Sequence, residues 1–217
     1  SYDRSCNLKC PSCRKNIIQA SHDEKKLFKT IQSNCIEPLL KDSNTLVSIT
    51  YSGDPFASSH YRKLLHRLKS IEYQNIGIAI ATNGINLTPE VWQTYSELWR
   101  KVKLITISVD AATKRTYQKM RPPGDWDLLI KNLRYLAKWK DTEKLGTKLI
   151  LNFCVQSDNL SEMIAFYDLA EQLCFDQVYY QRLLNWGMYT TEEYNRLDVA
   201  QASNIRHKDL INHLNEI

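Results

Sequence analysis

Short apolar runs alternate with segments of helical periodicity along most of the chain. Runs rich in β-branched residues predict five strands, at Leu46–Tyr51, Ile76–Thr82, Leu104–Val109, Lys148–Val155 and Gln177–Leu184. Apolar residues spaced three and four apart predict helices before and between these strands, at His22–Leu40, Tyr61–Ile71, Leu128–Trp139 and Leu160–Cys174. Strands that alternate with helices indicate an α/β fold with a parallel sheet, because each parallel pair needs a crossover connection.

Polar and apolar residues alternate within several of the predicted strands. The polar positions that share one face are Ser48, Thr50 and Ser52, then Thr106, Ser108 and Asp110, and then Asn152, Cys154 and Gln156. Because a packed barrel interior is filled by branched apolar residues, this polar face predicts a cavity that holds a polar ligand. The alternative is an antiparallel sheet with one solvated face, which the helices between the strands disfavour.

The length and composition predict one globular domain with a short appendage. The chain has 217 residues, of which 43% are hydrophobic and 24% charged, and this excludes a disordered protein. We assign residues 1–187 to a core domain. We predict that residues 188–217 are a helical C-terminal extension, because a helix start signal at Thr190 and an amphipathic stretch at Lys208–Ile217 follow the last strand. The same residues could equally open a second domain.

Charge and hydropathy narrow the range of partners. The net charge of +5 is spread along the chain instead of gathered in clusters, so we expect no nucleic acid as a partner. The apolar runs are too short to cross a bilayer and we find no signal peptide, so we expect no membrane association. Disulfide frameworks usually belong to smaller secreted chains, and the six cysteines here therefore favour a reduced, cytoplasmic setting.

Three of the six cysteines crowd into one short loop. The sequence Cys6-Asn-Leu-Lys-Cys10-Pro-Ser-Cys13 has the spacing C-x3-C-x2-C and directly precedes the first predicted helix. Three thiolates suit a soft metal centre, and a [4Fe–4S] cluster held by three cysteines leaves one iron open. The alternative is a structural zinc site with His22 as the nearest fourth ligand, although zinc sites more often use two C-x2-C pairs.

This loop resembles the signature of the radical SAM enzyme superfamily. The stretches Asp110–Thr113, Gly124–Asp127 and Asn185–Gly187 also resemble the branch of that family with SPASM or twitch extensions. The resemblance covers residues 1 to about 187 and implies a partial (βα)6 TIM-like barrel, which here lacks most of the first strand. It also implies a [4Fe–4S] cluster on Cys6, Cys10 and Cys13, with S-adenosylmethionine (SAM) bound at the open iron.

By the same resemblance, the SAM contacts come from the carboxyl ends of successive strands. The matching residues are Ser52, Gly53, Asp54 and Pro55 for the SAM amino group, Thr82 and Asn83 in the next turn, Ser108 and Asp110 beside the ribose and methionine, Arg121 for the carboxylate, Asn152 and Gln156 for the ribose, and Leu183 beside the adenine. Each also has a structural interpretation, as a turn, a helix cap or a solvated loop charge. Their placement at strand ends, where βα barrels build their sites, favours a functional role.

Two features depart from the family pattern. Ser12 stands where relatives usually carry an aromatic residue over the adenine, and no cysteine follows Cys174 to hold the auxiliary clusters of the SPASM branch. The chain therefore either works with one cluster or is the core of a longer protein.

The resemblance implies that SAM is cleaved reductively to a 5′-deoxyadenosyl radical that abstracts hydrogen from a substrate. A ribosomally made peptide is the first expected substrate and a sugar or other small molecule the second, with a reductant such as flavodoxin or ferredoxin as partner. Cys154, on the inner face, could return a hydrogen atom to a substrate radical, as in an epimerase; the alternative is a buried structural cysteine. The other functions that we consider are a non-catalytic remnant that binds SAM or a partner, and a zinc-stabilised α/β binding module.

Overall fold

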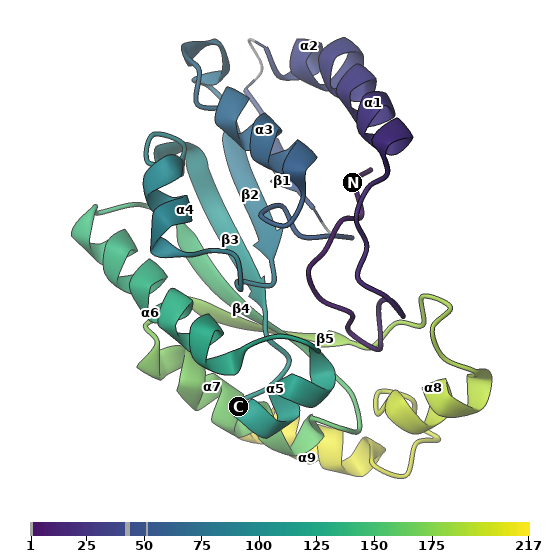
Figure 1. Ribbon diagram of the computed structural model, residues 1–217. Coiled ribbons are helices and arrows are strands. Elements are labelled where there is room, and N and C mark those ends of the chain that lie inside the picture. Colours follow the sequence, from purple (N-terminus) through teal and green to yellow (C-terminus); the bar gives the residue numbers. More distant parts are fainter. Residues whose placement is uncertain (1, 42–43, 51) are drawn as a thin grey trace.

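A parallel sheet runs through the part of the chain that the computed structural model describes, residues 2–41, 44–50 and 52–217. Its strands lie in sequence order and all pair in parallel: β1 (Leu46–Ile49), β2 (Gly77–Thr82), β3 (Val102–Ser108), β4 (Lys148–Val155) and β5 (Gln177–Arg182). The predicted strands are confirmed within two residues, although Tyr51 lies outside the described residues. The antiparallel alternative is wrong. Helices alternate with these strands as in a partial TIM-like barrel (Figure 1).

The predicted helices are confirmed, and two further helices were missed. The helical elements are α1 (His22–Ile31), the π-helical turn η1 (Gln32–Ile36), α2 (Glu37–Leu40), α3 (Ser59–Arg67), η2 (Ile71–Tyr73), α4 (Pro89–Thr94), η3 (Trp99–Lys101), α5 (Lys114–Met120), α6 (Trp126–Thr142), η4 (Leu160–Glu162), α7 (Met163–Gln172), α8 (Thr191–Leu197) and α9 (His207–Glu216). The missed helices are α4 and α5, which have six and seven residues. Helices this short show too few turns for an apolar period to stand out.

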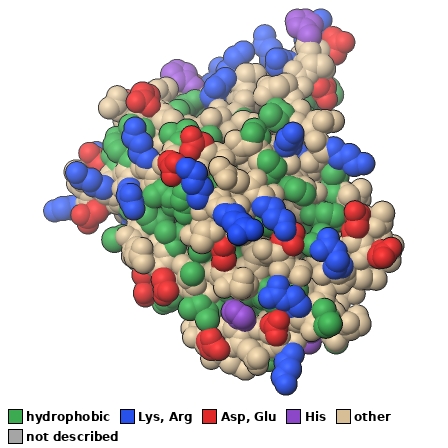
Figure 2. All heavy atoms as spheres, turned by 60° about the horizontal axis from the view of Figure 1, so that its bottom comes forward, with side chains coloured by type: hydrophobic (Ala, Val, Ile, Leu, Met, Phe, Trp, Pro, Cys, Tyr) green, Lys and Arg blue, Asp and Glu red, His purple; other side chains and the backbone are tan. Residues whose placement is uncertain are grey.

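Charges are mixed on the surface at the end of the molecule that Figure 2 brings forward. Lys and Arg side chains lie among Asp and Glu side chains on this face, with apolar side chains between them. Among the described residues, no helix is long and apolar enough to cross a membrane.

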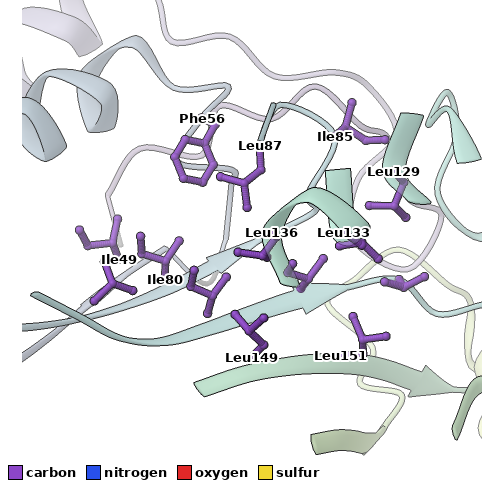
Figure 3. Close-up of a cluster of buried hydrophobic side chains, with 14 of the residues drawn as sticks. Ile49, Phe56, Ile80, Ile85, Leu87, Leu129, Leu133, Leu136, Leu149 and Leu151 are labelled. Carbon is purple, nitrogen blue, oxygen red and sulfur yellow. The ribbon is translucent and has the colours of Figure 1, made fainter. Parts of the chain in front are cut away.

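The main core lies between the sheet and the helices that cover its outer face. Figure 3 shows Leu133 and Leu136 of α6 over the strands that carry Ile80, Leu149 and Leu151. All five side chains are at most 2% exposed. Burying a leucine or isoleucine side chain contributes about 1.5–3 kcal/mol, so this layer fixes the strands and thereby the position of their carboxyl ends.

The segment that carries the three loop cysteines lies on the other side of the sheet from α4 and α6 (Figure 1). It contains an isolated antiparallel bridge between Cys6 and Ile18. Asp54 N donates to Ser5 O at 2.8 Å, which ties the segment to the carboxyl end of β1. The cysteine loop is thereby held against the strand ends.

Candidate functional site

Backbone hydrogen bonds shape the cysteine loop. The carbonyl of Cys10 accepts from the N–H groups of Cys13 and Arg14, at 2.9 and 3.0 Å, which closes a tight turn. Cys6 N donates to Ile18 O at 3.0 Å and anchors the start of the loop. Cys6 and Cys10 are buried, and Cys13 is half-buried. The three predicted cluster ligands therefore lie together at one end of the sheet.

Each of the three sulfur atoms has its own nitrogen donor. Asn83 Nδ2 lies 3.8 Å from Cys6 Sγ, and Arg121 Nη1 lies 3.8 Å from Cys10 Sγ. Cys13 Sγ accepts from Nε and Nη2 of the neighbouring arginine, at 3.4 and 3.3 Å. Donors of this kind stabilise a sulfur that carries negative charge, as a thiolate ligand does.

Burial opposes ionisation of the free thiols. Burial raises the pKa of Cys10 to about 11, although the nearby Arg121 acts to lower it. Burial likewise raises the pKa of Cys6, against hydrogen bonding from the Leu8 backbone and the charge of Arg14. Both side chains are thus thiols at neutral pH, and a metal centre that binds them must displace their protons.

Among the described residues, no three or more His, Cys, Asp or Glu side chains gather closely enough to hold one metal ion. His22, the fourth ligand of the zinc alternative, is the exposed first residue of α1. A zinc ion needs its ligands within about 2.3 Å. A four-iron cluster places each cysteine on a different iron, so its ligands need not converge on one point.

Asp54 is fully buried and braces the end of β2. One carboxylate oxygen accepts from the N–H groups of Phe56 and Ala57, at 3.0 and 3.1 Å. The other accepts from Thr82 Oγ1 at 2.7 Å and from Asn83 N at 2.8 Å. Burial raises the pKa of Asp54 despite these four bonds. The predicted SAM-binding elements after β1 and β2 are therefore joined through this one carboxyl group.

Asp110 and Arg121 form a largely buried ion pair, with 2.6 Å between Asp110 Oδ2 and Arg121 Nη2. Asp110 has a φ of 60°, and its Oδ1 accepts from Cys154 N at 2.7 Å. Burial acts to lower the pKa of Arg121, but the Asp110 charge raises it above the usual arginine value. Arg121 therefore stays charged, and its buried Nε has no partner among the described residues.

The inner face of β3 and β4 carries further polar side chains. Asn152 and Gln156 are 5% and 2% exposed, and the buried Asn152 Oδ1 has no hydrogen-bond partner in the described chain. Ser108 is half-buried on the same side, and the buried Leu183 lies just beyond β5. A buried polar atom without a partner costs free energy unless a ligand or water satisfies it. These atoms and the cysteine donors fit a polar ligand beside a cluster.

A small cavity opens between the cysteine loop and the strand ends. Its volume is about 50 Å³, and its lining consists of Pro11, Ser12, Lys119, Met120, Gln156, Asp158 and Tyr189. This space holds only a few water molecules. A ligand as large as a nucleoside exceeds this volume.

Cys154 lies on the same inner face, in a separate apolar cluster with Leu183 and Leu197. It is 8% exposed. Burial, and next the Asp110 charge, raises the pKa of Cys154 to about 12. Its side chain is therefore a neutral thiol at physiological pH, carrying an S–H hydrogen.

Two contributors to the site were missed by the sequence analysis. Arg14 contacts Cys13 Sγ, and Asn159 Nδ2 donates to the carbonyls of Asp110 and Cys154 at 2.9 Å each. A charged residue next to the last cysteine was the signal for Arg14, but its partners lie in distant parts of the sequence. The sequence around Asn159 indicates only a loop, and nothing in it marks Asn159 as part of a site.

Comparisons with known proteins bear on the family and the fold of the chain. The model of the radical SAM superfamily matches residues 3–166. Among curated proteins, no significant match was found.

Solved structures share the fold at low sequence identity. SuiB of Streptococcus suis bound to its precursor peptide SuiA aligns with a TM-score of 0.60 and 16% identity, over 99% of this chain and 44% of SuiB. SuiB bound to S-adenosylmethionine aligns with a TM-score of 0.57 and 16% identity, over 98% of this chain and 45% of SuiB. The protein anSMEcpe with bound AdoMet and the Cp18Cys peptide aligns with a TM-score of 0.52 and 17% identity, over 84% of this chain and 49% of anSMEcpe. The chain thus spans less than half the length of these proteins.

Proposed function

The chain belongs to the radical SAM superfamily of enzymes, whose cofactors are a [4Fe–4S] cluster and SAM, and on this premise we propose that it cleaves SAM reductively. Cys6, Cys10 and Cys13 would hold the cluster. When bound and reduced, the cluster supplies an electron that cleaves SAM to methionine and a 5′-deoxyadenosyl radical, which then abstracts hydrogen from the substrate.

One observation carries this proposal: each sulfur of the cysteine loop has a separate nitrogen donor. Two of these donors, Asn83 and Arg121, lie beyond the ends of β2 and α5. Three thiolates would bring three negative charges into a buried site, and such a site is stable only when hydrogen bonds and positive charge compensate them. These donors and the Arg121 charge therefore offset part of the cost that burial places on the ionised, ligating form of the sulfurs.

The remaining polar groups would bind and orient SAM. Arg121 would be the charged donor for the carboxylate, and Asn152 Oδ1, which has no partner among the described residues, would accept from a ribose hydroxyl. Backbone groups of Ser52–Pro55 would bind the amino group, and the internal hydrogen bonds of the Asp54 side chain would hold this loop in position. The remaining proposed contacts are Thr82, Asn83, Ser108, Asp110 and Gln156 as polar groups, and Leu183 as an apolar wall for the adenine.

We propose a peptide as the substrate, with a sugar or other small molecule as the second candidate. The support for a peptide is that SuiB was solved with a precursor peptide and anSMEcpe with the Cp18Cys peptide. A flavodoxin or ferredoxin in the cytoplasm would supply the electron. Residues 1–187 would be the catalytic core, and residues 188–217 its C-terminal extension.

Cys154 is our candidate for a hydrogen donor to a substrate radical. A donor must still carry its S–H hydrogen, and a pKa of about 12 ensures this at neutral pH. Its place on the inner face, beside Asn152, supports the same role. Epimerisation is therefore the reaction outcome that this residue would serve.

The test is 5′-deoxyadenosine formation by anaerobically reconstituted protein with dithionite and SAM. Wild type should bind about four irons and four sulfides per chain and release 5′-deoxyadenosine slowly without substrate. Cys10→Ala should lose cluster and product. Cys35→Ala removes an exposed cysteine of η1 and should retain both.

Product from Cys10→Ala would contradict the assignment. A full cluster without SAM cleavage would support the non-catalytic remnant, and one bound zinc per chain would support the zinc-stabilised module.

A further inference from the structure

Arg14 is a buried cation without a carboxylate partner. It is 6% exposed, and it appears in none of the ion pairs formed by the described residues. Its Nη1 donates to Arg4 O at 2.7 Å, and its Nη2 to Ser52 O at 2.8 Å. Nε and Nη2 also donate to Cys13 Sγ, at 3.4 and 3.3 Å.

Of the groups in the described chain to which Arg14 donates a hydrogen bond, only the sulfur of Cys13 can carry a full negative charge. Backbone carbonyls satisfy the donors of a guanidinium but leave its charge uncompensated, and a buried charge is costly without a counter-charge. The other arginine of the site differs in this respect, because Arg121 already pairs with Asp110 at 2.6 Å. Arg14 thus needs an anion at Cys13.

We infer that Arg14 is a positioning residue that holds Cys13 as a cluster ligand and raises the reduction potential of the cluster. The inference rests on the proposed function. By binding Ser52 O and Arg4 O with the same guanidinium, Arg14 also fixes Cys13 relative to the loop after β1 and to the segment before Cys6.

The direction of the effect follows from charge. Reduction adds one electron to the cluster, and a nearby positive charge stabilises the more negative state. N–H donors to a ligating sulfur act in the same direction. Burial strengthens both effects, because little water lies between the guanidinium and the sulfur.

The test compares Arg14→Gln with Lys9→Gln, a change of equal charge in the same loop. Lys9 is exposed, so solvent and salt screen it. We would reconstitute each variant anaerobically and measure iron content, then titrate the cluster potentiometrically by EPR. Arg14→Gln should shift the one-electron equilibrium toward the oxidised cluster at least tenfold, a drop of about 59 mV. Lys9→Gln should shift it by a small fraction of that.

Arg14→Lys separates charge from geometry. A lysine keeps the positive charge but cannot reach Arg4 O, Ser52 O and Cys13 Sγ together. The cluster of Arg14→Lys should therefore keep a reduction potential close to that of wild type. It should also lose iron to a chelator more readily than the wild-type cluster does. If Arg14→Gln folds but loses iron while Lys9→Gln retains it, the loss supports the role of Arg14 in holding Cys13. The potential of Arg14→Lys, expected near the wild-type value, then tests the effect of charge.

The inference is overturned if Arg14→Gln holds full iron with the potential of Lys9→Gln. It is equally overturned if Arg14→Lys shows the low potential expected for Arg14→Gln, since its charge would then have no effect. A wild-type protein that assembles no iron–sulfur cluster would instead contradict the proposed function.

Discussion

Gly53 lies where the segment leading to the first cysteine crosses the loop after β1. A Cβ atom on Gly53 would lie 2.7 Å from Ser5 O and 3.0 Å from Asp3 O, both of them backbone atoms. Asp54 N bonds to the same Ser5 carbonyl at 2.8 Å. A methyl group here would push the cysteine segment away from the strand end, and no side-chain rotation could relieve the contact. Gly53 therefore has a packing role in addition to its proposed place beside SAM.

We expect Gly53→Ala to destabilise the protein by about 1–3 kcal/mol, as overpacked positions do, and to weaken cluster retention. Urea unfolding and iron content after reconstitution measure the two effects. Gly146→Ala is the matched control, because a Cβ there meets nothing within 4 Å. A Gly53→Ala protein as stable as Gly146→Ala, with full iron, would show that the two segments do not approach this closely.

Single residues also show what a sequence can and cannot reveal about the site. The cysteines and the motifs after β1 and β2 are marked by local spacing, so they could be identified at once. Arg14 could not, because its role depends on carbonyls at positions 4 and 52 that only the folded chain brings together. Asp54 was expected to face SAM, and its four internal hydrogen bonds became visible only in the fold.

At the scale of elements, α5 positions Arg121 and is itself held by a carboxylate from η4. Glu162 accepts from Ala112 N at 2.6 Å and Thr113 N at 3.1 Å. It also accepts from the hydroxyls of Thr113 and Thr116, at 2.7 and 2.5 Å. The sequence did not predict α5, because its tertiary contacts stabilise it more than its own periodicity does. The five strands, by contrast, were predicted within two residues from their apolar, β-branched runs.

Glu162→Gln should weaken this attachment, because one oxygen acceptor becomes an NH2 group that faces other donors. We expect a loss of about 2 kcal/mol in unfolding free energy, in the range of a hydrogen bond to a charged group. SAM affinity should also fall, since Arg121 follows α5 directly. Glu143→Gln, at an exposed residue, controls for the loss of charge. Equal stability of the two variants in urea would refute the role of Glu162.

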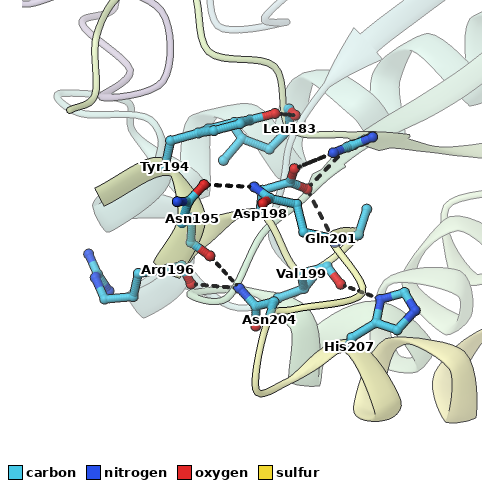
Figure 4. A network of polar contacts seen from close by, with 11 residues as sticks. Leu183, Tyr194, Asn195, Arg196, Asp198, Val199, Gln201, Asn204 and His207 are labelled. Carbon is cyan, nitrogen blue, oxygen red and sulfur yellow. Dashed lines mark hydrogen bonds and ion pairs between the residues drawn. The ribbon is translucent and has the colours of Figure 1, made fainter. Parts of the chain in front are cut away.

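At the scale of the whole molecule, the C-terminal residues are joined to the site end of the sheet. Ser157 N donates to Leu197 O at 2.9 Å, and Tyr194 OH donates to Leu183 O at 3.0 Å. Asp198 is fully buried and pairs with Arg182 of β5 at 2.7 Å (Figure 4). Such long-range polar contacts leave no local pattern, so the sequence predicted a helical extension packed on the domain but not the residues that attach it.

This attachment gives a prediction about pH. Burial acts to raise the pKa of Asp198, but the hydrogen bonds and the charge of Arg182 act to lower it, and the net shift is downward. A lowered folded-state pKa means that Asp198 stabilises the protein above its unfolded pKa of about 3.9, and that this stabilisation is lost as pH falls through the folded value. Asp198→Asn should therefore cost about 2 kcal/mol at pH 7 and progressively less below pH 4.

Urea unfolding of wild type and Asp198→Asn at pH 7 and at pH 3 measures the loss of unfolding free energy at each pH. Asp209→Asn is the control, because Asp209 forms an exposed ion pair with Arg206 and should contribute under about 0.5 kcal/mol at either pH. The unfolding free energies of wild type and Asp198→Asn could instead differ by the same amount at pH 7 and pH 3. Ionisation of Asp198 would then not hold the C-terminal residues in place. If the difference in unfolding free energy between wild type and Asp198→Asn shrinks in acid, while that of Asp209→Asn stays the same, the attachment of residues 190–217 depends on the Asp198 carboxylate.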